Sequence, residues 1–126
     1  MFAPEICPPA VFDVTTTAHA SVVAATGELD LAVTEHLETL LRRELRLAPA
    51  LVFDASAVTF CSARVLTILV DTAQEAAASG VPFAVASRSR ALLRPIAVLR
   101  LEHLLPVRRS TGEALARLGL VVREPA

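Results

Sequence analysis

The sequence of 126 residues contains no tryptophan, no tyrosine and only two cysteines, Cys7 and Cys61. These cysteines are far apart in sequence, so they fit a reduced cytosolic chain better than a disulfide scaffold. The three histidines, His19, His36 and His103, are scattered and lack the spacing of metal ligands. We therefore expect no disulfide framework, no metal site and no cofactor.

The chain also lacks a long apolar run and a basic stripe. Its uninterrupted apolar runs are far shorter than the ~20 residues of a membrane-spanning helix. Residues 1–10 carry Glu5 and three prolines without a basic region, which excludes a signal peptide. Twelve basic and 13 acidic residues give a formal charge of −1. These features predict a cytoplasmic protein whose partner is neither a membrane nor a nucleic acid.

A hydrophobic fraction of 54% is above the usual value of about 45–50% and suffices for one core. We expect a flexible arm over residues 1–10, one domain over residues 11–120 and a tail over residues 121–126. The order of strand and helix patterns predicts an α/β fold with a mostly parallel sheet that begins with an antiparallel pair.

Apolar periodicity and turn residues set the expected elements. Strands are predicted at 11–16, 20–25, 51–53, 81–86 and 104–107, and helices at 34–47, 64–78, 90–99 and 110–118. The segment 26–30 is predicted to break the second strand. Thr34 is the expected N-cap of the first long helix, whose leucines at 37, 40, 41 and 45 form one apolar face. Pro95 is expected either to kink the helix at 90–99 or to set its start.

The stretch from Leu51 to Asp71 is the most informative. A buried strand leads to Asp54, which we expect to hold the following loop by accepting backbone N–H bonds. Val58–Phe60 is interpreted as a short apolar loop. Cys61, Ser62 and Ala63 then open a helix, and its N-terminal N–H groups favour an anion or a phosphate. Cys61 itself is predicted to be a small buried residue.

Several motifs in this order resemble the STAS domain, the module of bacterial anti-sigma factor antagonists. The first is Gly27-Glu28-Leu29-Asp30-Leu31, and the second places Asp54, Ser56, Val58 and Phe60 at alternate positions. Leu66, the run 104–107 and Glu113-Ala114 follow at matching places. The resemblance implies a small mixed sheet with packed helices. It also implies a protein that docks on an anti-sigma factor of the GHKL serine kinase type and so releases a sigma factor.

The motif departs from the family pattern where the resemblance implies phosphorylation by that kinase. Ser62 falls where the family has aspartate, and Ala63 falls on the phosphorylated serine. Arg64 replaces a serine or threonine, and Val65 replaces a glycine that allows a partner loop to approach. Ser62 is open to three interpretations: a helix N-cap, a displaced phosphoacceptor, or neither. Arg64 is either a solvated arginine or a contact to an acidic partner surface.

The resemblance places a partner-binding surface on two segments. Its residues are Gly27, Glu28, Asp30, Cys61, Ser62, Ala63, Arg64, Val65 and Leu66. Asp30 is equally well explained as a turn carboxylate. The run Ser87–Arg90 is interpreted as a solvated helix entry, with a docking surface or an anion site as the alternatives. Because no catalytic constellation is visible, we expect no enzyme. The alternative function is a STAS-like scaffold or oligomerising subunit without a kinase partner, and a homodimer is compatible with either function.

Overall fold

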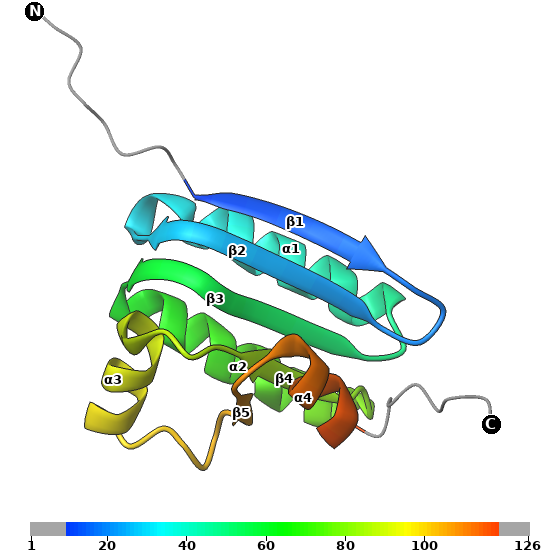
Figure 1. Cartoon of the computed structure of the whole chain (residues 1–126). Helices are drawn as coiled ribbons and strands as arrows, with labels where there is room; N and C mark the ends of the chain where they lie inside the picture. Colours follow the sequence, from blue (N-terminus) through cyan, green and yellow to red (C-terminus); the bar gives the residue numbers. More distant parts are fainter. Residues whose placement is uncertain (1–9, 119–126) are drawn as a thin grey trace, which may run out of the picture.

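A five-stranded sheet forms the centre of the computed structural model, which describes residues 10–118 (Figure 1). The strands are β1 (Val11–Thr16), β2 (Ser21–Leu29), β3 (Leu51–Cys61), β4 (Phe83–Ala86) and β5 (Val107–Arg108). Their order in the sheet follows the sequence; β1 is antiparallel to β2 and the other neighbours are parallel. The predicted α/β class is confirmed. The expected tail at 121–126, and all of the expected arm except residue 10, lie outside the described residues.

The helices cover both faces and one end of this sheet (Figure 1). They are the 3-10 turn η1 (Leu31–Val33) and the helices α1 (Thr34–Leu47), α2 (Ala63–Ser79), α3 (Arg90–Val98) and α4 (Thr111–Arg117). The main core lies between the sheet and α1 and α2, and a smaller one between Ala114 of α4 and Val52, Ala84 and Ala86. None of the described helices is long and apolar enough to cross a membrane.

The first long helix follows its predicted pattern but not its predicted start. Its four leucines at 37, 40, 41 and 45 are buried, as the spacing requires. Thr34 is not the N-cap, because a 3-10 turn precedes the helix and the Thr34 hydroxyl donates to the carbonyl of Leu31. Asp30 caps that turn instead, accepting a bond from the Ala32 N–H at 3.0 Å.

The helix α2 is capped at both ends. Ser62 is its N-cap. Gly80 terminates it with φ +74°, a left-handed conformation that glycine adopts without steric cost. Leu66 and Leu69 are fully buried and Val70 is partly buried, and their i, i+3, i+4 spacing forms the face of α2 toward the sheet.

The strands β2 and β3 are longer than predicted, since β2 runs through the expected break at 26–30 and β3 includes the expected loop at 58–60. Two register shifts interrupt their pairing, between Ala24 and Thr26 and between Gly27 and Glu28. Such bulges insert unpaired residues and disturb the alternation of buried and exposed side chains. After Asp54 the buried residues of β3 are 55, 58 and 61, a spacing of three that does not indicate a strand.

The C-terminal third differs from the prediction in its strands. The last strand spans Val107–Arg108, not residues 104–107, because Leu104 and Leu105 both bond back to the Leu101 carbonyl in a turn. Pro95 lies inside α3 and does not set its start. Ser110 and Glu113 cap α4 as predicted: the Ser110 hydroxyl accepts from the Glu113 N–H, and the Glu113 carboxylate accepts from the Arg109 N–H.

Leu69→Ala should lower the free energy of unfolding by about 2–5 kcal/mol, because it removes a fully buried side chain and leaves a cavity between α2 and the sheet. Leu47→Ala is the matched control, since that leucine is 72% exposed at the end of α1. Urea denaturation, monitored by circular dichroism, measures the free energy of unfolding of both variants. Equal and small losses would contradict the assignment of the core face.

Candidate partner-docking site

The paired ends of β2 and β3 bring the two predicted segments of the site together. Leu29 pairs with Cys61 at the last position of the ladder, and the Ser62 N–H donates to the Leu29 carbonyl at 2.9 Å. The residues that follow the two strands, Asp30 and Ser62, therefore line one shallow hollow of about 390 Å³. Strand ends that meet at one edge are where open α/β sheets usually present their binding residues.

Ser62 occupies the N-cap of α2, so this interpretation of the residue is confirmed. Its backbone is extended, and its hydroxyl oxygen accepts a bond from the Val65 N–H at 3.4 Å. This bond satisfies one of the free N–H groups of the first helical turn. The Ser62 side chain is half-buried and is turned toward its own helix.

Ala63 and Arg64 form the exposed part of the first turn of α2. The Arg64 guanidinium lies 3.9 Å from Glu38 of α1, and the same carboxylate pairs with Arg42 at 3.4 Å. All three side chains are substantially exposed, so the cluster adds little stability. It nevertheless directs Arg64 toward α1. The Ala63 methyl group is left as the outermost feature of the helix start.

Three residues assigned to the binding surface are buried. Val65 and Leu66 are 0% and 1% exposed, and Cys61 is 7% exposed. They belong to the core between α2 and the sheet, so they support the surface without presenting side chains to a partner. The side chain of Val65, which replaces the family's glycine, is fully buried and points away from solvent.

Gly27 and Glu28 have different places in the site. Gly27 is half-buried, at the second register shift of β2, with φ +103°. A side chain there would be strained in this conformation, so the glycine is explained by the bulge. Glu28 pairs with Phe60 across the strands and is exposed. Of these two residues, Glu28 is the one that offers a charged side chain to a partner.

Exposed apolar side chains surround this end of the sheet, and the sequence-based list of site residues omitted them. Leu31 is 70% exposed, Phe60 49%, Val98 69% and Leu99 51%. Phe60 lines the hollow beside Asp30 and also a second one of about 390 Å³ between β3 and α3. The sequence predicts Phe60 in a loop, and its pattern does not assign the exposed side of α3 to the site. The feature of the sequence that could have indicated this surface is Phe60, an aromatic residue two positions before the N-cap of α2.

A polar network fastens α3 and α4 to β3. The Ser87 hydroxyl donates to the Ala55 carbonyl at 3.1 Å, and the Ser89 hydroxyl donates to the Val58 carbonyl at 2.7 Å. The run Ser87–Arg90 is thus not a plain solvated entry: Ser87 is buried, and Ser89 also caps α3. The ladder between β3 and β4 ends at Asp54 and Ala86, so the serines that follow β4 supply partners for carbonyl groups beyond that end.

Asp54 acts on the backbone as predicted and also makes a contact that was not foreseen. Its Oδ1 accepts from the Ser56 N–H at 2.9 Å, and its Oδ2 accepts from the Thr111 hydroxyl at 3.1 Å. The first bond holds the bulge of β3, and the second ties it to α4. Asp54 therefore has a positioning role within the fold.

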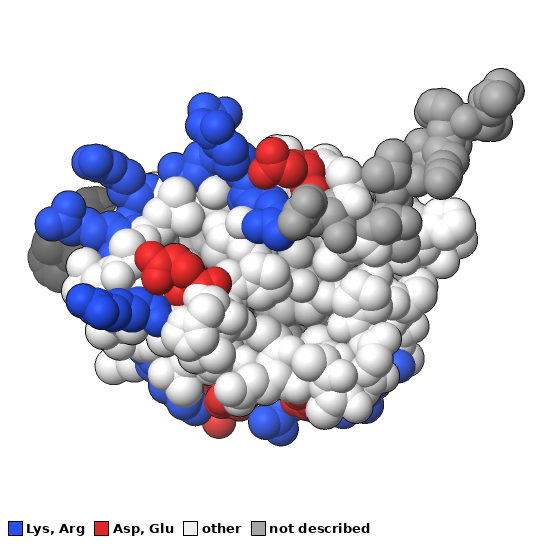
Figure 2. Space-filling view, turned by 90° about the horizontal axis from the view of Figure 1, so that it is seen from below, with Lys and Arg blue, Asp and Glu red and all other residues white. Residues whose placement is uncertain are grey.

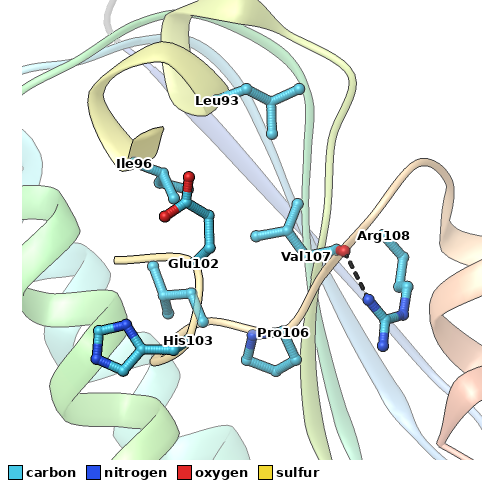
Figure 3. Close-up of a pocket in the computed structure, with 8 residues that line it drawn as sticks. Leu93, Ile96, Glu102, His103, Pro106, Val107 and Arg108 are labelled. Carbon is cyan, nitrogen blue, oxygen red and sulfur yellow. Dashed lines mark hydrogen bonds between the residues drawn. The ribbon is translucent and has the colours of Figure 1, made fainter. Parts of the chain in front are cut away.

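A further hollow of about 700 Å³ lies between α3 and β5 (Figure 3). The Glu102 carboxylate lies near Ile96, whereas the Arg108 guanidinium lies on the far side of Val107 and donates to its carbonyl at 3.0 Å. The lining pairs no nucleophile with a base. Among residues 10–118, no three metal-ligating side chains cluster.

Comparison with known proteins identifies the family. The family model described as "Mlab, STAS domain" matches residues 12–106. The chain belongs to the STAS domain family. A comparison with curated protein sequences finds no match.

Solved structures with this fold include several antagonists of anti-sigma factors. An anti-sigma factor antagonist from Mycobacterium paratuberculosis is 28% identical with a TM-score of 0.77, covering 88% of this STAS domain chain and 95% of its own. Unphosphorylated SpoIIAA, a Bacillus anti-sigma factor antagonist, is 15% identical (TM-score 0.73; 90% and 100% covered). A chain of the stressosome, a signal integration and transduction hub, is 19% identical (TM-score 0.63; 89% and 100% covered).

Burial raises the pKa of the Cys61 thiol from about 9 to about 11. At pH 8 the native protein should therefore contain roughly a hundred-fold less Cys61 thiolate than an exposed cysteine would, and alkylation should slow accordingly. The measurement is iodoacetamide labelling of a Cys7→Ser variant, with the urea-unfolded protein as the control. Equal labelling rates in the native and unfolded states would show that Cys61 is accessible.

Proposed function

We propose that this STAS domain is an anti-sigma factor antagonist that docks on a GHKL-type anti-sigma kinase through the ends of β2 and β3 and the start of α2. The observation that carries the proposal is the shared hollow of Asp30 and Ser62, bordered by the exposed apolar side chains of Leu31 and Phe60. An apolar centre with a charged rim is the usual composition of a protein–protein contact.

The exposed and half-buried residues of this end make up the proposed docking surface. They are Glu28, Asp30, Leu31, Phe60, Ser62, Ala63 and Arg64. Leu31 and Phe60 offer apolar area, and Glu28 and Asp30 offer negative charge that orients a partner. The buried residues Cys61, Val65 and Leu66 hold this surface from beneath. We place the protein in the cytoplasm, where its proposed kinase partner acts.

We further propose that docking is not switched off by serine phosphorylation in the way that the family resemblance implies. Ala63 is exposed at the first position of α2 but carries no hydroxyl. The Ser62 hydroxyl already accepts from the Val65 N–H and is half-buried. A kinase would have to break this cap to reach it. The protein would thus bind its partner constitutively.

A scaffold in a larger signalling assembly is the second candidate function. Its support is the similarity to a stressosome chain and the position of β1, which is almost wholly exposed and is the outer strand of the sheet formed by residues 10–118. An unpaired strand edge can pair with another chain, including a second copy. Sedimentation of the purified protein tests this alternative, because edge pairing predicts a homodimer or larger species.

Asp30→Asn should weaken binding to the proposed GHKL-type kinase domain by about tenfold, because it removes a charge of the docking surface. The asparagine oxygen retains the cap on the Ala32 N–H, so the fold should persist. Isothermal titration calorimetry measures the affinity, and circular dichroism checks the fold. Asp71→Asn, at an exposed position further along α2, is the control. Unchanged affinity in Asp30→Asn would contradict the proposed surface.

Incubation with that kinase and ATP should leave the wild-type chain without phosphate, whereas Ala63→Ser should gain one phosphate at residue 63. The reason is that only the variant carries an exposed hydroxyl at the first position of α2. Mass spectrometry of the intact chain and its peptides provides the measurement, with Ala63→Val as a control. Stoichiometric phosphate on Ser62 of the wild type would contradict this prediction.

A further inference from the structure

A groove between the end of β3 and α3 extends the proposed docking surface. Its apolar lining includes Phe60, Pro95, Val98 and Leu99. Val98 and Leu99, the last residue and the C-cap of α3, are more than half exposed, whereas Leu92 and Ile96 are buried. The C-terminal end of the helix therefore offers apolar side chains to solvent.

Two arginines border this groove. Arg90 and Arg94 line it and are exposed, and their i, i+4 spacing places them on the same side of α3. Within the described part of the chain neither forms an ion pair, unlike Arg42, Arg43 and Arg64. Free guanidinium groups beside exposed apolar side chains are suited to a partner that brings both carboxylates and apolar side chains.

The segment that surrounds the groove is also rich in positive charge. The stretch from Arg88 to Arg109 contains six of the twelve basic residues of the chain but only one acidic residue, Glu102. Figure 2 shows blue side chains gathered on the side of the molecule where α3 lies. The net charge of the chain is only −1, but its charges are unevenly distributed. The end of the molecule that carries α3 therefore attracts negatively charged groups at distances up to the Debye length.

We infer that the groove binds an acidic amphipathic helix of the partner protein, with an apolar stripe seated on Phe60, Val98 and Leu99 and carboxylates paired with Arg90 and Arg94. This inference rests on the proposed function, since the groove and the Asp30 surface share Phe60 and form one continuous face. It adds the chemical class of the segment that the partner supplies. An amphipathic helix laid in an apolar groove is a common mode of peptide recognition.

The probe is a pair of synthetic helical peptides of about five turns with the same leucine stripe, one flanked by glutamates and the other by lysines. Each is titrated into the ¹⁵N-labelled full-length protein. The glutamate peptide should bind roughly tenfold more tightly and shift the amide signals of Phe60, Val98 and Leu99. Raising NaCl from about 50 to about 500 mM should reduce this preference. Equal affinities, or shifts confined to other regions, would overturn the inference.

Charge reversal identifies the residues responsible. The double variant Arg90→Glu/Arg94→Glu should lose the preference for the glutamate peptide and bind the lysine peptide instead. The control is Arg42→Glu/Arg46→Glu, an exposed pair with the same spacing on α1, which should leave the preference unchanged. If both double variants behaved like the wild type, the binding would not depend on α3 and the inference would fail.

Titration of the kinase domain separates this inference from the proposed function. Asp30→Asn should weaken the binding of the kinase domain but not that of the glutamate peptide, whereas the Arg90/Arg94 double variant should weaken the binding of both. Kinase binding that depends on Asp30 but not on the two arginines would overturn the groove assignment alone. Peptide binding as expected, without any binding of the kinase, would refute the proposed function and leave an acidic helix of another protein as the occupant.

Discussion

The parallel pairing of β2 with β3 is the constraint on which the rest of the structure depends. It aligns Leu29 with Cys61, and the bond from the Ser62 N–H to the Leu29 carbonyl then fixes the start of α2 against the end of β2. Asp30 comes next to Ser62 only because both strands end at this edge. The two bulges matter for the same reason, because without them the strand ends would be displaced in register.

The early end of β4 explains why the segment before α3 is polar and yet ordered. The ladder between β3 and β4 ends at Asp54 and Ala86, and carbonyl groups of β3 beyond that point need another donor. Ser87 and Ser89 provide hydroxyl donors to Ala55 and Val58, and in doing so they tie the start of α3 to β3. The position of the groove beside Phe60 therefore depends on two short hydroxyl side chains as well as on the apolar residues that line it.

Periodicity and capping residues predicted those parts of the fold where local rules act alone. The leucine face of α1 is of this kind, and so is the Ser62 N-cap of α2, which was one of three interpretations of that residue. The ends of β2 and β3 were missed because bulges break the alternation that marks a strand. The family resemblance predicted the docking surface as two segments. Val65 and Leu66 do not belong to its exposed part, because their side chains are buried. The groove beside α3 was not predicted, because its lining residues are about 30 positions apart in sequence.

Under the proposed function, the start of α2 would convert a switchable contact into a permanent one. Phosphate on an exposed hydroxyl would add a dianion to a surface that already carries Glu28 and Asp30, and repulsion and desolvation would oppose docking. Ala63 removes that possibility while retaining a good helix former at the first position. Ser62 then serves only to cap the helix. Regulation must in that case act elsewhere, either on the amount of protein or on competition for the arginine-edged groove.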